Sequence, residues 1–295
     1  MRVFVTGASG FIGSAVVQEL LGAGHSVLGL ARSDESAKAV AATGAAVLRG
    51  ELTDLAALRK GAAETDGVIH TAFIHDFSKF LENGQIDKRA IEAMGEVLAG
   101  KPLVVSSGIA LLSPGAVATE DMTIPQDAPA PRVSEQAAFA LAAKGVRSTA
   151  IRLAPSTHGA SDLGFKAGFV SYAIRVAREK GVSAYIGDGA NRWTQGHRLD
   201  AAKLYRLALE KGKAGSPYHA IGEEGVAVKD IAALIGRKLN LPVVSIAPEK
   251  AGEHFGFLGM FFGLDIPASS AKTQAELGWK PTGPGLLADM GANTF

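Results

Sequence analysis

Three evenly spaced glycines near the N-terminus constrain the fold of this chain more than any other feature. Gly7 and Gly10 lie between a short apolar strand at 3–5 and an apolar pattern of helical spacing at 11–21, and Gly13 lies in the first turn of that pattern. Gly7 permits a tight turn, Gly10 lets the backbone approach a pyrophosphate, and Gly13 lets the helix pack closely on the strand. The helix N-terminus offers unpaired N–H groups to phosphate oxygens. The pattern predicts a dinucleotide-binding loop and not a plain structural turn. The residues expected to contact the cofactor there are Thr6, Gly7, Ser9, Gly10, Phe11, Ile12 and Gly13.

Short apolar strands alternate with helices through the first half of the chain. The pattern predicts strands at 26–30, 46–48, 68–70 and 103–105, and helices at 33–43, 53–60 and 77–98. Strands of this kind belong to a parallel sheet that is buried on both faces. Because the crossovers between parallel strands are right-handed, the expected fold class is α/β, with a doubly wound parallel (Rossmann) sheet.

The second half is less regular and predicts a smaller C-terminal substrate lobe. A proline-rich surface loop at 113–132 precedes a helix at 134–143 and a strand at 148–153, and irregular segments follow. We expect an NAD(P)-binding Rossmann domain at 1–154. The remainder, 155–295, is expected to bind mainly substrate, with about 191–221 returning to the Rossmann domain.

Composition excludes several classes of function. The net charge is +1 and only 20% of residues are charged, which argues against nucleic acid and acidic membranes as partners. The absence of cysteine excludes disulfides and thiolate catalysis, and no metal is expected, because the sequence has no HExxH or comparable ligand spacing. The first residues are too short an apolar run for a signal peptide, and no apolar stretch is long enough to span a bilayer. We expect a cytoplasmic protein, a monomer or homodimer, with a small-molecule substrate.

Several further segments follow the glycine loop in a recognisable order. They read GELTD at 50–54, VIHTA at 68–72, RLAPSTHG at 152–159, GDG at 187–189 and HRLD at 197–200. Together with the loop, these segments resemble the extended short-chain dehydrogenases/reductases, which include nucleotide-sugar epimerases, dehydratases and reductases. The resemblance covers residues 1 to about 221. It implies further cofactor contacts from Glu51, Leu52, Thr71, Ala72 and Pro155.

The end of the second predicted strand bears on the choice between NAD and NADP. An acidic residue there would bind the ribose 2′-hydroxyl of NAD, but this chain has Arg32 followed by Ser33. A guanidinium can pair bidentately with a 2′-phosphate, and the serine can add a hydrogen bond. Asp34 is expected to cap the following helix. The sequence favours NADP, with NAD still possible, and the alternative for Arg32 is a solvated loop charge.

The family's Tyr-x-x-x-Lys pair is missing, because none of the four tyrosines has a lysine four positions later. In the family the lysine lowers the tyrosine pKa so that the phenol exchanges a proton with the substrate oxygen. Ser106 and Ser107 match the family's substrate-binding serine region, at the end of the fifth strand. Their alternative role is to cap that strand.

Two histidines and one tyrosine are candidate proton donors. His75 follows the fourth strand in a loop that overhangs the nicotinamide in this architecture, and His158 follows the sixth strand. Tyr172 lies on a helix expected to border the cleft. Each also has a structural alternative, such as a hydrogen bond near a helix N-terminus for His75.

Two features after the GDG turn bear on the substrate. Arg192 stands where related enzymes grip the phosphate of a nucleotide sugar, and Trp193 adjoins it. The aromatic run at 254–262 could instead form a lid over an apolar substrate, a buried helix or a dimer contact.

These observations leave two classes of function open. The first is an NAD(P)-dependent oxidoreductase of the epimerase/dehydratase type, with NADPH-dependent reduction of a carbonyl on a small, partly apolar substrate. The alternative is a non-catalytic NADP-binding sensor or regulator, which the missing Tyr-Lys pair makes plausible.

Overall fold

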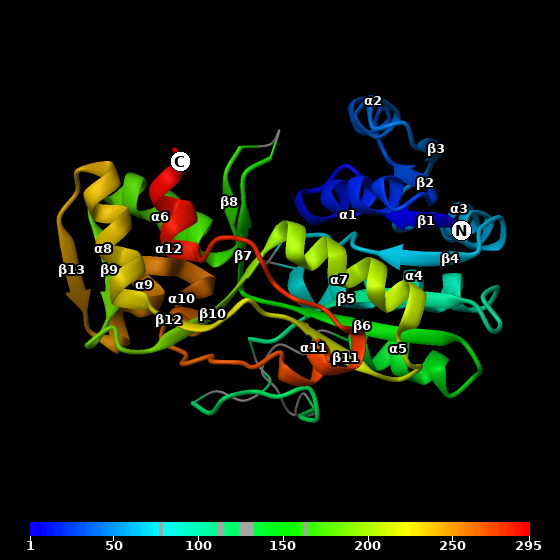
Figure 1. The fold of residues 1–295 in the computed structure, drawn as a ribbon. Helices are drawn as coiled ribbons and strands as arrows, with labels where there is room; N and C mark the ends of the chain where they lie inside the picture. Colours follow the sequence, from blue (N-terminus) through cyan, green and yellow to red (C-terminus); the bar gives the residue numbers. More distant parts are fainter. Residues whose placement is uncertain (77–78, 111, 113–114, 124–132, 162–163) are drawn as a thin grey trace.

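The computed structural model describes residues 1–76, 79–110, 112, 115–123, 133–161 and 164–295, and they form two lobes side by side (Figure 1). The first lobe alternates strands and helices, as the short apolar runs predicted. Its elements up to residue 153 are β1 (Arg2–Thr6), α1 (Phe11–Gly22), β2 (Ser26–Ala31), α2 (Asp34–Ala42), β3 (Ala46–Arg49), α3 (Leu55–Ala63), β4 (Gly67–His70), α4 (Phe80–Gly95), β5 (Pro102–Gly108), α5 (Ser134–Ala142) and β6 (Arg147–Leu153).

The strands of this lobe, joined by β11 (Pro217–Ala220), form a seven-stranded parallel sheet. Its order is β11-β6-β5-β4-β1-β2-β3, so the strand order reverses at β1. β1 pairs with β2 on one side and β4 on the other, and Val3, Phe4 and Val5 at its centre are fully buried. The doubly wound Rossmann sheet is confirmed. Sheets of this kind bind ligands outside the carboxyl ends of their strands, at the point where the order reverses.

Helices cover both faces of this sheet with apolar side chains. On one face α1 and α7 (Arg198–Lys211) pack together, and Leu20 and Tyr205 belong to the same buried cluster. On the other face α3, α4 and α5 contribute Leu58, Met94 and Leu141. The phosphate loop and the other strand–helix connections therefore emerge from a rigid core.

The second lobe is built on two small sheets. One has the order β12-β10-β7-β8, and the other pairs β13 with β9. The elements of this lobe are β7 (Ser156–Gly159), β8 (Lys166–Ala167), α6 (Phe169–Lys180), β9 (Ser183–Ile186), β10 (Arg192–His197), β12 (Glu223–Ala227), α8 (Val228–Leu239), β13 (Val243–Ile246), the 3-10 turns η2 (Pro248–Lys250) and η3 (Gly256–Leu258), α9 (Ala251–Phe255), α10 (Gly259–Phe262) and α12 (Leu286–Ala292).

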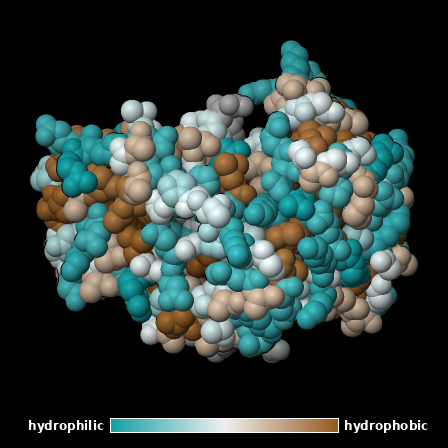
Figure 2. Space-filling model, viewed as in Figure 1, coloured by the Kyte–Doolittle hydropathy of each residue, from teal (hydrophilic) through white to brown (hydrophobic). Residues whose placement is uncertain are grey.

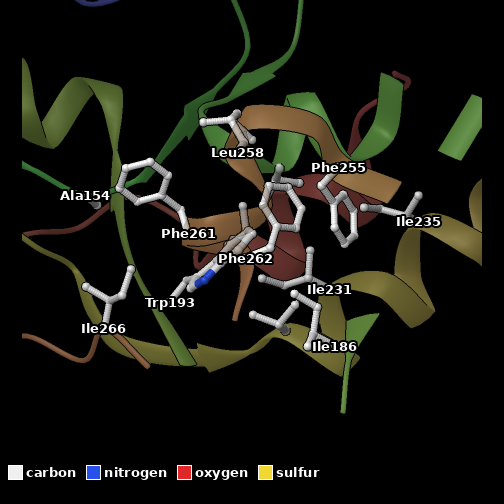
Figure 3. Close-up of a cluster of buried hydrophobic side chains, with 14 of the residues drawn as sticks. Ala154, Ile186, Trp193, Ile231, Ile235, Phe255, Leu258, Phe261, Phe262 and Ile266 are labelled. Atoms are coloured by element: carbon white, nitrogen blue, oxygen red, sulfur yellow. The ribbon is translucent and has the colours of Figure 1, made fainter. Parts of the chain in front are cut away.

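An aromatic cluster forms the core of the second lobe (Figure 3). The rings of Phe255 and Phe262 stack with centroids 4.0 Å apart, and Trp193 meets Phe262 edge-on at 4.9 Å. Phe257 and Met260 from the same run are exposed, at 45% and 52%. The run predicted as lid, buried helix or dimer contact is thus buried along one side and exposed along the other.

The chain passes between the lobes more than once. β10 lies in the second lobe's sheet, whereas α7 and β11, which follow it, belong to the Rossmann lobe. The segment containing α11 (Ala271–Leu277) also returns, because Leu277 and Trp279 are buried in the core beneath α7. The Nε1–H of Trp279 donates a hydrogen bond to the carbonyl oxygen of Asp200 at 2.9 Å.

A buried polar network lies beside β6 and β11. Arg152 donates to both carboxylate oxygens of Glu135, at 2.8 Å and 2.7 Å, and to the carbonyl of Met122 at 2.8 Å. Its Nη1 is 3.2 Å from Nε2 of His219, whose Nδ1 lies 2.7 Å from the carbonyl oxygen of Ser269. Because a guanidinium only donates and a carbonyl only accepts, His219 is neutral, with its proton on Nδ1.

On the face shown in Figure 2, hydrophilic and hydrophobic residues are interspersed. Within the described residues, no helix combines the length and the apolar character that crossing a membrane requires.

Candidate active site

A cavity of about 420 Å³ opens where the two lobes meet, which is a size typical of small-ligand sites. The Rossmann lobe contributes the start of α1 and the segments that follow β4, β5 and β6. The second lobe contributes α6 and the segment 257–261. The cavity therefore lies at the carboxyl edge of the parallel sheet, where the fold predicts a ligand.

The glycine loop fits a dinucleotide on three counts. Gly7 has φ +68°, and a Cβ there would lie 2.7 Å from the backbone nitrogen of Ala72. A Cβ on Gly13 would lie 2.0 Å from the carbonyl oxygen of Gly7, so the helix can pack on the loop only without a side chain. No side chain caps the N-terminus of α1, and its first turn has no acidic residue. Its N–H groups thus remain available for phosphate oxygens.

Buried and partly buried hydrogen bonds hold this loop to the end of β4. The hydroxyl of Thr71 donates to the carbonyl oxygen of Thr6 at 2.8 Å, and the Thr6 hydroxyl is 2.7 Å from Nδ1 of His70. Nε2 of His70 lies 2.9 Å from a carboxylate oxygen of Asp87, whose other oxygen accepts from Ser134. Thr6 and Thr71, both predicted cofactor contacts, therefore fix the geometry of the glycine loop. The Thr71 hydroxyl lies beside Gly7 and Gly13.

The structure places Arg32 directly after β2, with its side chain exposed, and no described residue forms an ion pair with it. Ser33 is the N-cap of α2, because its hydroxyl accepts a hydrogen bond from the backbone N–H of Ser36 at 3.1 Å. The cap predicted at Asp34 is therefore one residue earlier, and Asp34 instead pairs with Arg49 at 3.0 Å.

Glu51 and Leu52 follow β3, the next strand along the sheet. Glu51 is exposed and accepts a hydrogen bond from the Thr53 hydroxyl at 2.6 Å, and Leu52 is half-buried. Both thus lie at the same edge of the sheet as the glycine loop, on the side of β2.

The two candidate serines at the end of β5 point in different directions. The hydroxyl of Ser106 is 2.9 Å from the carbonyl oxygen of His70 and 2.6 Å from the Tyr205 hydroxyl, in the interior. Ser107 lines the cavity, is fully buried, and has no hydrogen-bond partner among the described residues. A buried hydroxyl without a partner is costly, and a ligand oxygen in the cavity would satisfy it.

His75 and Tyr172 face the same cavity from opposite lobes. Nδ1 of His75 is 3.1 Å from the carbonyl oxygen of Phe73, so this nitrogen carries a proton and Nε2 is the atom that exchanges one. The Tyr172 hydroxyl donates to the carbonyl oxygen of Phe255 at 2.8 Å, and Arg175 lies over its ring at 4.5 Å. The proton of Tyr172 is therefore already committed to the backbone.

Comparison with known families decides the identity of this arrangement. The model of the NAD dependent epimerase/dehydratase family matches residues 3–222, which include the glycine loop and the strand ends around the cavity. The chain belongs to the NAD dependent epimerase/dehydratase family. The resemblance to the extended short-chain dehydrogenases/reductases is thereby confirmed.

Relatives of this family member include two yeast proteins that match it along nearly their whole length. An uncharacterized protein of Schizosaccharomyces pombe is 51% identical over 100% of both chains, and one of Saccharomyces cerevisiae is 49% identical over 99% of both. A 4-hydroxy-2-methyl-3-oxo-4-farnesyl-3,4-dihydroquinoline-1-oxide ketoreductase of Stigmatella aurantiaca is 27% identical over 87% of this chain and 80% of that protein.

Solved structures of epimerases and dehydratases share the fold. A nucleoside-diphosphate-sugar epimerase from Pseudomonas aeruginosa has a TM-score of 0.75 at 19% identity and covers 98% of this chain and 95% of its own. A dTDP-glucose 4,6-dehydratase double mutant from Streptomyces venezuelae, solved with NAD bound, has a TM-score of 0.73 at 20% identity, with 98% and 96% covered. Family and neighbours together support an NAD(P)-dependent oxidoreductase type of function.

His158, the other candidate donor, lies outside the large cavity of this epimerase/dehydratase family member. It is buried on β7, and its Nδ1 is 2.6 Å from a carboxylate oxygen of Asp289 on α12, while its ring meets that of His197 edge-on at 5.4 Å. Ligand atoms of the three residues lie within 4.8 Å of one another. Burial, together with the nearby positive charge that His158 would carry, lowers the pKa of His197.

Arg192 and Trp193, predicted to bind substrate, are also not brought to the cavity. Both carboxylate oxygens of Asp265 accept from Arg192, at 3.0 Å and 2.8 Å. Trp193 is fully buried, packed edge-on against Phe169 and Phe262. Because side chains alternate along β10, Arg192 points outward and Trp193 points into the core, and neither side chain reaches the cavity.

Sequence reasoning missed most of the cavity wall. Besides the predicted Phe11, His75 and Tyr172, the aromatic residues that line it outside the run 254–262 are Phe73, Phe80 and Phe169, and Ile109 and Leu153 add aliphatic surface. Phe73 could have been predicted, because it lies three residues after β4 and two residues before the candidate His75, at a strand end that faces the ligand site. Phe80 and Phe169 begin helices far apart in the sequence, and no local pattern brings them together.

Proposed function

We propose that this protein reduces a carbonyl group on a small, partly apolar substrate with NADPH. The observation that carries the proposal is the unpartnered hydroxyl of Ser107 in a cavity that the first turn of α1 also lines. The cofactor loop and a free hydrogen-bonding group thus meet at one place, which is what a reduction at a bound cofactor needs.

The residues that would hold the cofactor are those of the glycine loop, with Thr71, Ala72 and Pro155 beside it. When bound, the nicotinamide supplies the hydride. Arg32 supports a preference for NADPH, because an exposed guanidinium at the end of β2 is available to pair with a 2′-phosphate. The absence of an acidic residue at this strand end supports the same preference.

The chain's own groups orient the substrate and provide the proton. Ser107 donates a hydrogen bond to the substrate oxygen and thereby fixes the carbonyl. His75 acts as the imidazolium, with both ring nitrogens protonated: it donates the proton of Nε2 to the substrate oxygen and keeps that of Nδ1, which is held by the carbonyl of Phe73. Tyr172 holds the segment containing Phe255 against α6, because its hydroxyl proton is used in that contact.

The test follows NADPH absorbance with a panel of aldehydes and ketones, in single-turnover experiments that separate chemistry from product release. We expect Ser107→Ala to slow hydride transfer roughly 10²- to 10³-fold. We expect His75→Phe to slow it about 10²- to 10⁴-fold, and NADPH affinity to be unchanged in both. Ser106→Ala is the matched control, because that hydroxyl faces the interior. NADPH binding without reduction of any carbonyl would favour the sensor.

A further inference from the structure

The wall of the cavity is apolar on the side away from the glycine loop. Phe73, Phe80 and Ile109 come from the Rossmann lobe, and Phe169, Leu258 and Phe261 face them from the second lobe. The polar groups among the described lining side chains are few: Ser107, His75, Thr157 and Tyr172. Three of these are already engaged: the Thr157 hydroxyl donates to the carbonyl of Ala154 at 3.0 Å, Tyr172 donates to the carbonyl of Phe255, and Nδ1 of His75 contacts the carbonyl of Phe73.

No arginine or lysine lines the cavity among residues 1–76, 79–110, 112, 115–123, 133–161 and 164–295. Three basic side chains of the second lobe are engaged elsewhere. Arg192 is paired with Asp265, Arg175 with Glu179, and Lys180 donates to the carbonyl of Glu253 at 2.9 Å. A phosphate, diphosphate or carboxylate would therefore lose its hydration in this part of the cavity without gaining a cation.

One aromatic side chain stands at the rim. Phe257 lines the cavity and is 45% exposed, whereas Phe261, one helical turn further on, is 8% exposed and packs against Phe169 with centroids 5.6 Å apart. In Figure 3 Phe261 lies on the Ala154 side of the core cluster, away from Ile235. A bound apolar molecule would cover the Phe257 ring and remove its surface from water.

We propose that the substrates are uncharged, apolar carbonyl compounds, and that Phe257 and Phe261 select them against anionic substrates such as nucleoside-diphosphate sugars. This inference rests on the proposed reductase function and names the substrate class of the same site. The aromatic wall binds the apolar body, and Ser107 is the one buried polar group left for the carbonyl oxygen among the described lining residues.

The experiment compares two aldehydes of similar size, 4-methylbenzaldehyde and the anionic 4-carboxybenzaldehyde, with NADPH. We expect kcat/KM to be at least about tenfold higher for the uncharged compound. Phe257→Ala should raise KM for it roughly 10- to 100-fold with little change in kcat, because an apolar contact contributes about that factor. Met260→Ala is the matched control, since this exposed side chain does not line the cavity. Phe261→Leu keeps a large apolar side chain, so we expect this variant to fold. It should lower the ratio of kcat/KM between the uncharged and the anionic aldehyde.

A binding measurement separates this inference from the reductase proposal. Calorimetry on the NADP⁺ complex with 4-methylbenzyl alcohol, 4-carboxybenzyl alcohol and UDP-glucose needs no turnover. Preferential binding of the uncharged alcohol, weakened by Phe257→Ala, supports the substrate class even if no aldehyde is reduced. Equal or tighter binding of either anion, or an unchanged affinity in Phe257→Ala, overturns the substrate class while leaving the reductase function intact.

Discussion

The neutral state of His219 makes a quantitative prediction about stability and pH. Burial is the main cause that lowers the pKa of this histidine, to about 4 in the folded protein, and the charge of Arg152 acts in the same direction. The nearby carboxylates of Glu120 and Glu135 oppose the shift without cancelling it. In the unfolded chain the imidazole has its ordinary pKa of about 6.5.

The sign of the effect follows from which state takes the proton first. Between pH 6.5 and 4 the unfolded chain binds a proton at His219 that the folded protein does not, so acidification favours unfolding. The folded state keeps its full advantage above about pH 6.5 and loses it as the pH falls towards 4. With these pKa values, the free energy of unfolding falls by about 2 kcal/mol from pH 7 to pH 4.5 on account of this group alone.

Urea unfolding of the wild type and of His219→Gln at several pH values isolates the contribution of His219 to the pH dependence of the free energy of unfolding. Glutamine keeps an acceptor for Arg152 and a donor for the carbonyl of Ser269 but does not titrate. We expect the stability difference between the two proteins to shift by about 2 kcal/mol against the wild type between pH 7 and pH 4.5. A difference that stays constant over this range would refute the neutral, buried state of His219.

Three further perturbations test other parts of the molecule. Arg32→Ala should reduce the preference for NADPH over NADH roughly 10- to 100-fold by calorimetry, through the lost phosphate contact; an unchanged ratio contradicts the role of Arg32. Gly10→Val should leave the protein folded, because a Cβ there would lie 3.1 Å from the carbonyl oxygen of Gly7, but it should abolish NADPH binding, because the valine methyl groups would enter the phosphate site. Retained NADPH affinity would contradict the role of this loop in phosphate binding. His158→Phe should lower the free energy of unfolding by about 1–3 kcal/mol, because one buried carboxylate oxygen of Asp289 loses its histidine partner, and should leave single-turnover hydride transfer unchanged. A large loss of rate would instead restore His158 as the proton donor.

The features that sequence predicts here are those set by neighbouring residues. The glycine spacing at 7, 10 and 13 determines the loop because each position has its own steric reason, and the short apolar runs determine the parallel sheet. The sequence cannot decide which of Ser106 and Ser107 faces the cavity, because successive side chains of a strand point to opposite faces. Only the register of β5 shows that Ser107 lines the cavity and Ser106 points into the interior.

Contacts between distant parts of the chain determine the rest. Arg192 looks free in the sequence, but its partner Asp265 is 73 residues away. His75 and His158 both follow strands, yet only the pairing of β7 with β10 and the approach of α12 place His158 beside Asp289. The family resemblance pointed to Arg192 and covered His158, but it carried no information on Asp265 and Asp289, which lie beyond the motifs that it covers.

The repeated passage of the chain between the lobes means that neither lobe is a separable folding unit. A fragment ending at residue 154 would lack β11, the edge strand paired with β6, as well as α7 and Trp279, which cover one face of its sheet. The complementary fragment would carry those same apolar surfaces with nothing to pack against. Denaturation should therefore be a single cooperative transition, and limited proteolysis should not release a stable cofactor-binding piece.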